Sequence, residues 1–201
     1  MLIIHGRIVA DELPGPFPSC RPGRQFTDRQ LSRRFRPGRD LDAWPQPVEA
    51  GIRLHRRIDA YTDRHPDVLA ALGLMSPVRR RFAGIIVDVA FDHFLVRHWS
   101  RYEARALPNF VAGVYRRLGD EAALMPETAR LRFERMREYD WLVSYGELEV
   151  VARALDAIAS RLSRRTALYG AGEEVVARYD ALETCFLRFY PQLLRWVEEQ
   201  G

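Results

Sequence analysis

Hydrophobic residues recur with a helical period along most of the chain after residue 47. The first predicted helix begins near Val48 and keeps an apolar side through Ile58. Further helices are predicted over residues 109–118, 126–138, 147–164 and 172–199, the last with a break at Pro191. Few segments alternate apolar and polar residues as strands do, and the chain shows no internal repeat. The pattern therefore predicts an all-α fold with a single helical domain.

Residues 77–100 are predicted to form a helix in the core. Pro77 suits a first helical turn, and apolar residues then fill most sides of the helix: Phe82, Ile85, Ile86, Val87, Val89, Phe91, Phe94, Leu95 and Val96. Two carboxylates, Asp88 and Asp92, interrupt this apolar run. Burying them is costly unless a metal ion or a guanidinium compensates their charge, so this helix is the first place to look for a site.

The first forty-odd residues differ in character from the rest. They hold seven of the twelve prolines: Pro14, Pro16, Pro18, Pro22, Pro37, Pro45 and Pro47. Proline removes a backbone donor and fixes φ, and the Arg-rich stretch over residues 21–39 has no sustained apolar period. We therefore expect an irregular segment over residues 1–43, followed by a helical domain over residues 44–201.

Composition narrows the class of protein but says little about its partners. The chain has 201 residues, long enough for a core without disulfides, and its two cysteines, Cys20 and Cys185, cannot form a disulfide framework. No apolar run approaches the roughly 20 residues that span a membrane, so we expect a cytoplasmic protein without a membrane span. All 31 basic residues are Arg against 27 acids, a net charge of +4. Residues 1–42 contribute 8 − 5 = +3 of this charge, so the helical part alone does not indicate an acidic partner.

Histidines stand beside acids at helical spacing in two of the predicted helices. His55 and Asp59 are four residues apart and share a helix face, as do Asp88 and Asp92, which His93 follows. Imidazole and carboxylate donors from two packed helices suit a divalent ion such as Mn, Fe or Zn. Such an ion lowers the pKa of a bound water toward roughly 7–9 and neutralises charge on a phosphoryl oxygen.

Structural explanations compete with this interpretation. An imidazole and a carboxylate at this spacing often form only a surface hydrogen bond. For the acidic pair of the core helix, the alternative explanation is an ion pair with Arg79, Arg80 or Arg97. His65, which precedes Pro66, is predicted to be a solvated turn residue. His98 is compatible with either side of its helix.

Several ungapped motifs resemble the acyl carrier protein phosphodiesterases between about Trp44 and Arg195. They are Gly51-Ile52-Arg53-Leu54-His55-Arg56-Arg57-Ile58-Asp59, Thr62-Asp63, Asp92-His93-Phe94-Leu95, Arg97-His98-Trp99, Tyr179-Asp180-Ala181-Leu182-Glu183-Thr184 and Phe189-Tyr190-Pro191. The resemblance implies a helical bundle like that of the HD-type metal phosphohydrolases. It also implies Mn-dependent hydrolysis of the phosphodiester that joins 4′-phosphopantetheine to a serine of holo acyl carrier protein.

Combined with this resemblance, the helical spacing assigns a role to each candidate residue. The expected metal ligands are His55, Asp92 and His93, with Mn²⁺ as the ion. We expect Asp59 to be a ligand or its partner, and Asp88 to orient or deprotonate the water. The side chains expected to meet the phosphodiester or the acidic carrier protein are Arg56, Arg57 and His98.

Two other functions are compatible with the same residues. One is an HD-type phosphohydrolase that acts on a nucleotide or a different phosphodiester. The other is a non-catalytic helical module that binds an acidic protein or nucleic acid through its arginines.

The N-terminal segment departs from the family, and a shifted reading frame accounts for the difference. Family members begin Met-Asn-(Phe/Tyr)-Leu-Ala-His-Leu-His-Leu and later carry Asp-Phe-Val-(Lys/Arg)-Gly. Read one nucleotide later with permitted codons, residues 11–19 become Met-Asn-Phe-Leu-Ala-His-Phe-His-Leu, and residues 33–38 become Gly-Asp-Phe-Val-Arg-Gly. We infer that residues 1 to about 41 are a wrong-frame translation. Arg34 then replaces an expected metal-ligand Asp, and Pro16 and Pro18 replace two histidines, so we expect this polypeptide to be an impaired catalyst.

Overall fold

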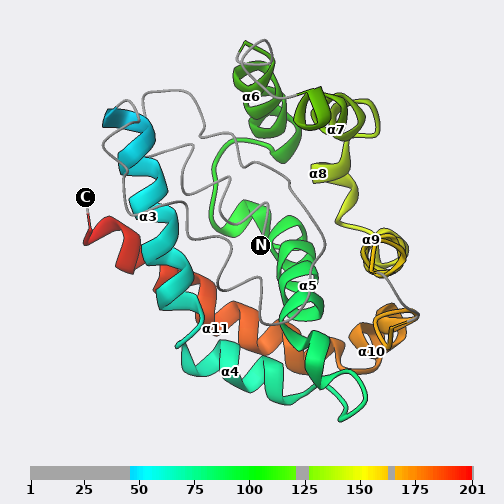
Figure 1. Cartoon of the computed structure of the whole chain (residues 1–201). Coiled ribbons are helices and arrows are strands. Elements are labelled where there is room, and N and C mark those ends of the chain that lie inside the picture. Colours follow the sequence, from blue (N-terminus) through cyan, green and yellow to red (C-terminus); the bar gives the residue numbers. More distant parts are fainter. Residues whose placement is uncertain (1–45, 121–126, 163–165, 201) are drawn as a thin grey trace.

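The protein is helical throughout the part that its structure, a computed structural model, describes: residues 46–120, 127–162 and 166–200 (Figure 1). The helices are α3 (Gln46–Thr62), α4 (Pro66–Gly73), α5 (Ala83–Arg97), α6 (Leu107–Asp120), α7 (Glu127–Glu138), α8 (Trp141–Ser144), α9 (Leu148–Ser160), α10 (Ala171–Ala177) and α11 (Tyr179–Glu198). Two 3-10 turns, Arg80–Phe82 and Trp99–Arg101, flank α5. No strand occurs among these residues, which confirms the all-α prediction. The predicted irregular segment over residues 1–43 lies outside the described residues.

Helices α5 and α11 form the centre of the fold. They pack against each other, and α4 covers both. Helix α9 packs on α5, and α10 packs on α9 and also contacts α5 and α11 (Figure 1). Ten of the fifteen residues of α5 are buried, as the apolar pattern of this segment predicts. The prediction of a core helix in this segment is thus confirmed.

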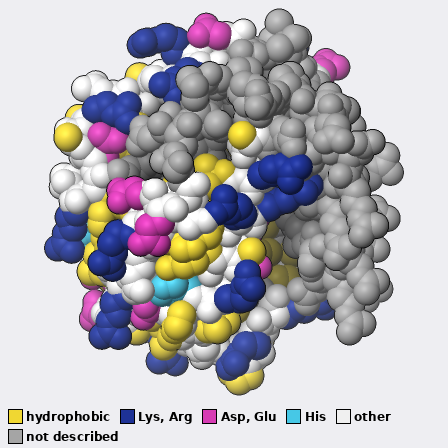
Figure 2. All heavy atoms as spheres, turned by 90° about the vertical axis from the view of Figure 1, so that its left-hand side faces the viewer, with side chains coloured by type: hydrophobic (Ala, Val, Ile, Leu, Met, Phe, Trp, Pro, Cys, Tyr) yellow, Lys and Arg dark blue, Asp and Glu magenta, His cyan; other side chains and the backbone are white. Residues whose placement is uncertain are grey.

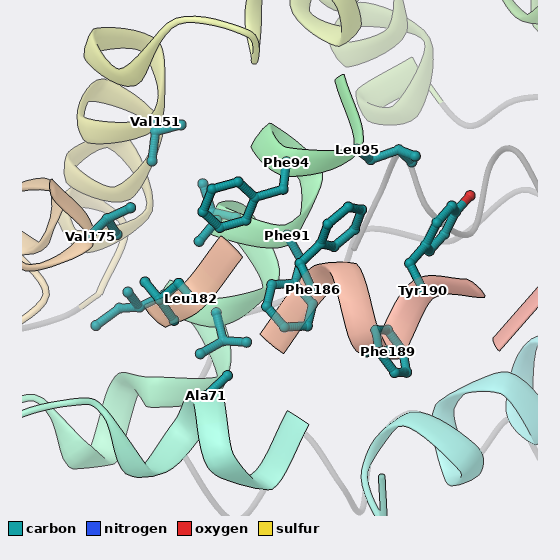
Figure 3. Close-up of a cluster of buried hydrophobic side chains, with 14 of the residues drawn as sticks. Ala71, Phe91, Phe94, Leu95, Val151, Val175, Leu182, Phe186, Phe189 and Tyr190 are labelled. Atoms are coloured by element: carbon teal, nitrogen blue, oxygen red, sulfur yellow. The ribbon is translucent and has the colours of Figure 1, made fainter. Parts of the chain in front are cut away.

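An aromatic cluster joins the two central helices (Figure 3). Phe91 of α5 meets Phe186 edge to face at a centroid distance of 5.5 Å, and Phe186 stacks on Tyr190 at 5.3 Å. Phe94 and Phe189 complete the cluster, and all five side chains are almost fully buried. Aromatic side chains of this size supply much of the apolar area that holds a core together. The α5–α11 contact is therefore well fixed, and side chains along its edge have defined positions.

Two predicted helix boundaries are wrong. The core helix begins at Ala83 and not at Pro77, because Arg79 turns back to donate from Nε to the Ala167 carbonyl at 2.9 Å and holds the preceding segment as a turn. Helix α11 runs through Pro191 without a break, since buried residues on both sides of the proline hold the helix against the core. The break within residues 172–199 lies instead at Arg178, between α10 and α11.

The short helices α4 and α8 were not predicted, because both are shorter than the window over which a helical period is detectable. Helices α6, α7 and α8 form a group at the top of the view (Figure 1). The Tyr115 hydroxyl links them, since it donates to the Met136 carbonyl at 3.1 Å and accepts from the Leu142 N–H at 3.4 Å. Within the described ranges, no helix is long and apolar enough to cross a membrane.

Candidate functional site

His93 lies in the interior of the protein and uses both ring nitrogens. It is 1% exposed on α5, and its Nδ1 lies 2.8 Å from the Tyr145 carbonyl, in the loop between α8 and α9. Its Nε2 lies 3.2 Å from the hydroxyl of Tyr179, the first residue of α11. Burial lowers the pKa of His93 and outweighs the opposing hydrogen bond to Tyr145, so the imidazole is neutral at physiological pH.

The two partners fix the tautomer of this neutral ring. A carbonyl oxygen only accepts, so Nδ1 carries the proton and donates to Tyr145. The lone pair is then on Nε2, where the Tyr179 hydroxyl donates to it. An Nδ1–H held by a backbone carbonyl is typical of histidines that bind a metal or a proton through Nε2.

The buried carboxylate of α5 is Asp92. It is 3% exposed, and it lies near the Tyr145 ring, whose pKa is raised to about 12 by burial first and by the Asp92 charge second. Asp88, one turn earlier, is exposed. The expectation that both carboxylates of this helix are buried is therefore wrong for Asp88, because its position falls on the side of α5 that the neighbouring helices leave uncovered.

On α3, His55 and Asp59 form the predicted pair. Nδ1 and Oδ2 are 3.1 Å apart, and the side chains are 40% and 48% exposed. The hydrogen bond to Asp59 is the main cause that raises the pKa of His55. The pKa of Asp63, one turn further along α3, is raised by burial and then by the Asp59 charge. The structure thus confirms the contact, whereas the predicted metal-binding role of the pair stays a prediction.

A second histidine, at the end of α5, faces α11. His98 Nε2 lies 2.8 Å from Glu183 Oε1, and its ring stacks on Phe186 at 6.4 Å. Sequence reasoning singled out His98 but gave no role to Glu183 or Tyr179. These two are four residues apart and therefore share a face of α11, a spacing that was visible in the sequence.

His65 differs from its prediction. It is 6% exposed and not solvated, and its Nδ1 accepts the Asp67 N–H at 3.3 Å as the N-cap of α4. Its ring packs edge to face on Phe189 at 5.0 Å. The turn before Pro66 was correctly predicted, but the burial of its histidine depends on α11, which lies far away in sequence.

The two candidate arginines of α3, Arg56 and Arg57, have different surroundings in the structure. Arg57 lies over the Trp196 ring at 5.7 Å, and Trp196 in turn stacks on Tyr61 at 4.7 Å. Arg56 is exposed on another side of the helix, since neighbouring residues are about 100° apart. Figure 2 shows arginine side chains spread among exposed hydrophobic ones on the face that includes α3. Arg57 is thus the one of the two that packs on the Trp196 ring of α11.

Comparison with known proteins places the chain in a family. A family model described as acyl carrier protein phosphodiesterase matches residues 30–193. The chain belongs to this family. The match begins before Trp44, where the resemblance was expected to begin. No solved structure matches the chain significantly, so the HD-like arrangement of the bundle stays a prediction.

Individual members of the family match most of the chain. The acyl carrier protein phosphodiesterase of Enterobacter sp. (strain 638) is 38% identical over 165 residues, which cover 80% of this chain and 83% of that protein. That of Serratia proteamaculans is 36% identical over 171 residues, with 83% and 86% covered. That of Klebsiella pneumoniae is 34% identical over 187 residues, with 90% and 92% covered.

The metal expected of this family can be tested only in part on the described residues. His93 fits such an ion, because the Tyr145 carbonyl orients its ring with the lone pair on Nε2. Yet no three His, Cys, Asp or Glu side chains within residues 46–120, 127–162 and 166–200 are close enough together to hold a metal. The positions of Pro16, Pro18 and Arg34, which the resemblance places at this site, lie outside those ranges. The described residues alone therefore do not complete a coordination shell.

Proposed function

We propose that this protein is a phosphodiesterase that releases 4′-phosphopantetheine from holo acyl carrier protein and leaves the apo protein. The observation that carries the proposal is His93, a buried neutral imidazole whose Nδ1–H is held by a backbone carbonyl and whose neighbour Asp92 is a buried carboxylate. Membership of the family gives the substrate. In this reaction a water oxygen bonds to phosphorus, the bond from phosphorus to the serine oxygen breaks, and the serine oxygen takes a proton.

The roles of the chain's residues follow from their positions. Nε2 of His93 carries the lone pair that would take a proton or an ion in exchange for the Tyr179 hydroxyl, and the preceding residue, Asp92, supplies a buried carboxylate. Asp88, being exposed, is positioned to contact water at the surface of α5. On α3, His55 and Asp59 supply a second imidazole and carboxylate pair, and Arg56 supplies a cation for a phosphate or an acidic protein.

Metal dependence is part of the proposal. We propose Mn²⁺ as the ion, with His93 as a ligand and with further donors outside the described residues, since His55, Asp92 and His93 do not form a group that could hold the ion by themselves. When bound, the ion would lower the pKa of a water and neutralise phosphoryl charge. A cytoplasmic location and the absence of a nucleic-acid partner belong to the same proposal, because they follow from a carrier protein as substrate.

Mass spectrometry of the carrier protein tests the function. The chain is incubated with holo acyl carrier protein with and without added Mn²⁺, and conversion to the apo form is followed by the loss of the phosphopantetheine mass. We expect Mn-dependent conversion and a loss of at least about 100-fold in turnover on His93→Ala. His65→Ala is the matched control, since it also truncates a buried histidine, one that caps α4 and packs on Phe189 and has no part in the proposed reaction.

Three outcomes would contradict the proposal. Hydrolysis of nucleotides in place of the carrier protein would indicate a different phosphohydrolase. Binding of an acidic protein without turnover, unchanged by His93→Ala, would indicate a non-catalytic helical module. Equal loss of turnover in His93→Ala and His65→Ala at equal folded fraction would show that His93 only supports the fold.

A further inference from the structure

An open hollow lies between α10 and the turn that precedes α5. Its volume is about 520 Å³, within the range of roughly 300–1,000 Å³ that is usual for pockets that bind small molecules. Its lining comes from the turn, from α10 and from the residue that follows α10: Ser76, Arg79, Glu173, Glu174, Ala177 and Arg178. Helix α10 also contacts α5, so the two sides of the hollow belong to one packed unit (Figure 1).

Hydrogen bonds fix one side of this hollow. The Ser76 N–H donates to Glu174 Oε1, and Glu174 Oε2 lies 3.1 Å from both the Ser76 hydroxyl and Arg79 Nη1. The other nitrogens of Arg79, Nε and Nη2, donate to the carbonyls of Ala167 and Tyr169. These groups satisfy one another, so they give the hollow a preformed shape and leave recognition of a ligand to its other lining residues.

The exposed polar groups of the hollow are one acceptor and one donor. Glu173 is a carboxylate, which only accepts hydrogen bonds, and Arg178 is a guanidinium, which only donates them. A secondary amide has the complementary pair, one N–H and one carbonyl oxygen. A free anion fits less well, because the carboxylates of Glu173 and Glu174 would repel it. The lining therefore suits a neutral chain that contains amides.

The hollow is within reach of His93. Arg178 directly precedes Tyr179, whose hydroxyl lies 3.2 Å from His93 Nε2. Along α5, His93 is about 15 Å from Ala83, the first residue of the helix, at a rise of about 1.5 Å per residue. The arm of 4′-phosphopantetheine contains two amides, and its chain of about thirteen bonds from phosphorus to sulfur is roughly 15 Å long when extended. Its phosphorus can therefore lie at His93 while its amides reach the hollow.

We propose that this hollow binds the pantetheine arm of the substrate, with Glu173 accepting from an amide N–H and Arg178 donating to an amide carbonyl. The identity of the ligand rests on the proposed function. Neither the sequence pattern nor the family comparison assigns a function to the hollow. The serine and the arm are attached to different oxygens of the phosphodiester, so the carrier protein lies across His93 from α10. Figure 1 shows α5 between α10 and α3, the helix that carries Arg56.

Titration of the ¹⁵N-labelled chain with free pantetheine tests the site without turnover. The Ser76 amide is the reporter, because it donates to Glu174 at the hollow. We expect its resonance to shift saturably in the wild-type chain. In Ala177→Phe, whose ring occupies part of the hollow, the dissociation constant should rise at least about 5-fold. In Arg178→Ala it should rise about 3- to 10-fold, as for the loss of one hydrogen bond. Ala112→Phe is the matched control, since Ala112 is exposed on α6, and it should bind pantetheine like the wild type.

Turnover of the holo carrier protein is the second measurement. The arm is held in the same way before and during the reaction, so Ala177→Phe should raise KM about 5-fold with little effect on kcat. An unchanged KM in this variant overturns the inference.

The titration separates failure of this inference from failure of the proposed function. A Ser76 resonance that does not saturate with pantetheine, or equal affinities in Ala177→Phe and Ala112→Phe, overturns the inference whatever the activity. Equal affinity for acetyl-triglycine amide also overturns it, because the hollow would then accept any chain of amides. If the wild-type chain does not convert the holo carrier protein, the proposed function fails, and the titration still decides whether the hollow binds pantetheine.

Discussion

At the scale of single residues, the polar side chains inside this protein serve mainly to join segments that are distant in sequence. His93 connects α5 to the α8–α9 loop and to α11, and His98 connects α5 to Glu183. Glu174 of α10 does the same for the turn before α5. Its carboxylate accepts the Ser76 N–H and lies 3.1 Å from Arg79 Nη1. Each contact is satisfied on both sides, which is the condition for polar groups to be stable when buried.

Glu174 makes stability depend on pH in a defined direction. Burial acts to raise its pKa, but the Ser76 N–H and the Arg79 guanidinium outweigh burial and hold the pKa below the usual 4.5. The stability contributed by the ionised carboxylate is therefore complete above pH 4.5 and is lost as the pH falls through the lower pKa of the folded protein. We expect Glu174→Gln to cost about 1–3 kcal/mol of unfolding free energy at pH 7, and this difference to shrink below pH 4.5.

Urea unfolding at both pH values measures the difference. Glu173→Gln is the matched control, because Glu173 is the exposed neighbour on the same helix, and it should leave stability within about 0.5 kcal/mol. A Glu174→Gln variant as stable as the wild type at pH 7 would show that the contact with Ser76 and Arg79 contributes nothing.

The adjacent arginines of α3 provide a second test at this scale. Arg56→Ala should raise KM for the holo carrier protein by about 5- to 10-fold, because it removes a cation from the side of α3 on which a phosphate or an acidic protein is proposed to bind. Arg57→Ala should instead cost about 0.5–1 kcal/mol of stability, because the guanidinium leaves the Trp196 ring. Steady-state kinetics and thermal unfolding of both variants separate the two effects. Equal changes in KM would show that both arginines contact the substrate.

At the scale of elements, the close approach of α9 and α10 depends on one glycine. At Gly172, near the start of α10, a Cβ would lie 2.5 Å from the Ala152 Cβ and 2.8 Å from its Cα. Real contacts of this kind are not that short, so the backbones of α9 and α10 approach only because residue 172 has no side chain. The α9–α10 pair therefore depends on glycine at this position.

Gly172→Ala should destabilise the protein by about 1–3 kcal/mol, because the helices have to move apart. Gly84→Ala is a matched control, since Gly84 is also the second residue of its helix and a methyl group there would have no atom within 4 Å. We expect that variant to be neutral or more stable by up to about 1 kcal/mol. Thermal unfolding compares the two, and similar melting temperatures would show that α9 and α10 adjust without strain.

The helices also show how much of the fold the hydrophobic period of the sequence predicts. Long periods predicted α6, α7 and α9 within a few residues, and they predicted the body of α5. Helices α5, α6 and α9 each bury several residues against the core. The turn over residues 77–82 was assigned to a helix, because its stability comes from Arg79 and its contacts with Glu174 and the carbonyls of Ala167 and Tyr169. Local pattern carries no information about partners that lie almost a hundred residues away.

At the scale of the whole molecule, the candidate site lies where α5, α11 and the loop between α8 and α9 come together, as the contacts of His93 show. The described residues supply an oriented imidazole and a buried carboxylate, and the family match extends from residue 30. The expected contribution of the N-terminal segment is an additional Asp and two histidines, in whose places this chain has Arg34, Pro16 and Pro18.

The reading-frame hypothesis gives a prediction for the complete site. The nucleotide sequence should contain an ATG that overlaps the Asp11 codon, with the frame restored before Trp44. A chain expressed from that start should bind Mn²⁺ and convert holo acyl carrier protein at least about 100-fold faster than the present chain, because it regains the missing ligands. Calorimetric titration of Mn²⁺ and the mass assay measure both quantities. An absent ATG, or equal activity of the two chains, would contradict the hypothesis.

The sequence by itself determined the all-α class, the core position of the α5 segment, the pairing of His55 with Asp59 and the membership of the family. These features depend on local period and on motifs, which are written along the chain. Only the tertiary structure decided that Asp92 is buried while Asp88 is exposed, that His65 caps a helix inside the protein, and that Tyr145 and Tyr179 take the two nitrogens of His93. The reason is physical: burial and hydrogen-bond partners depend on which distant segments pack together, and that packing is set by the aromatic contact between α5 and α11.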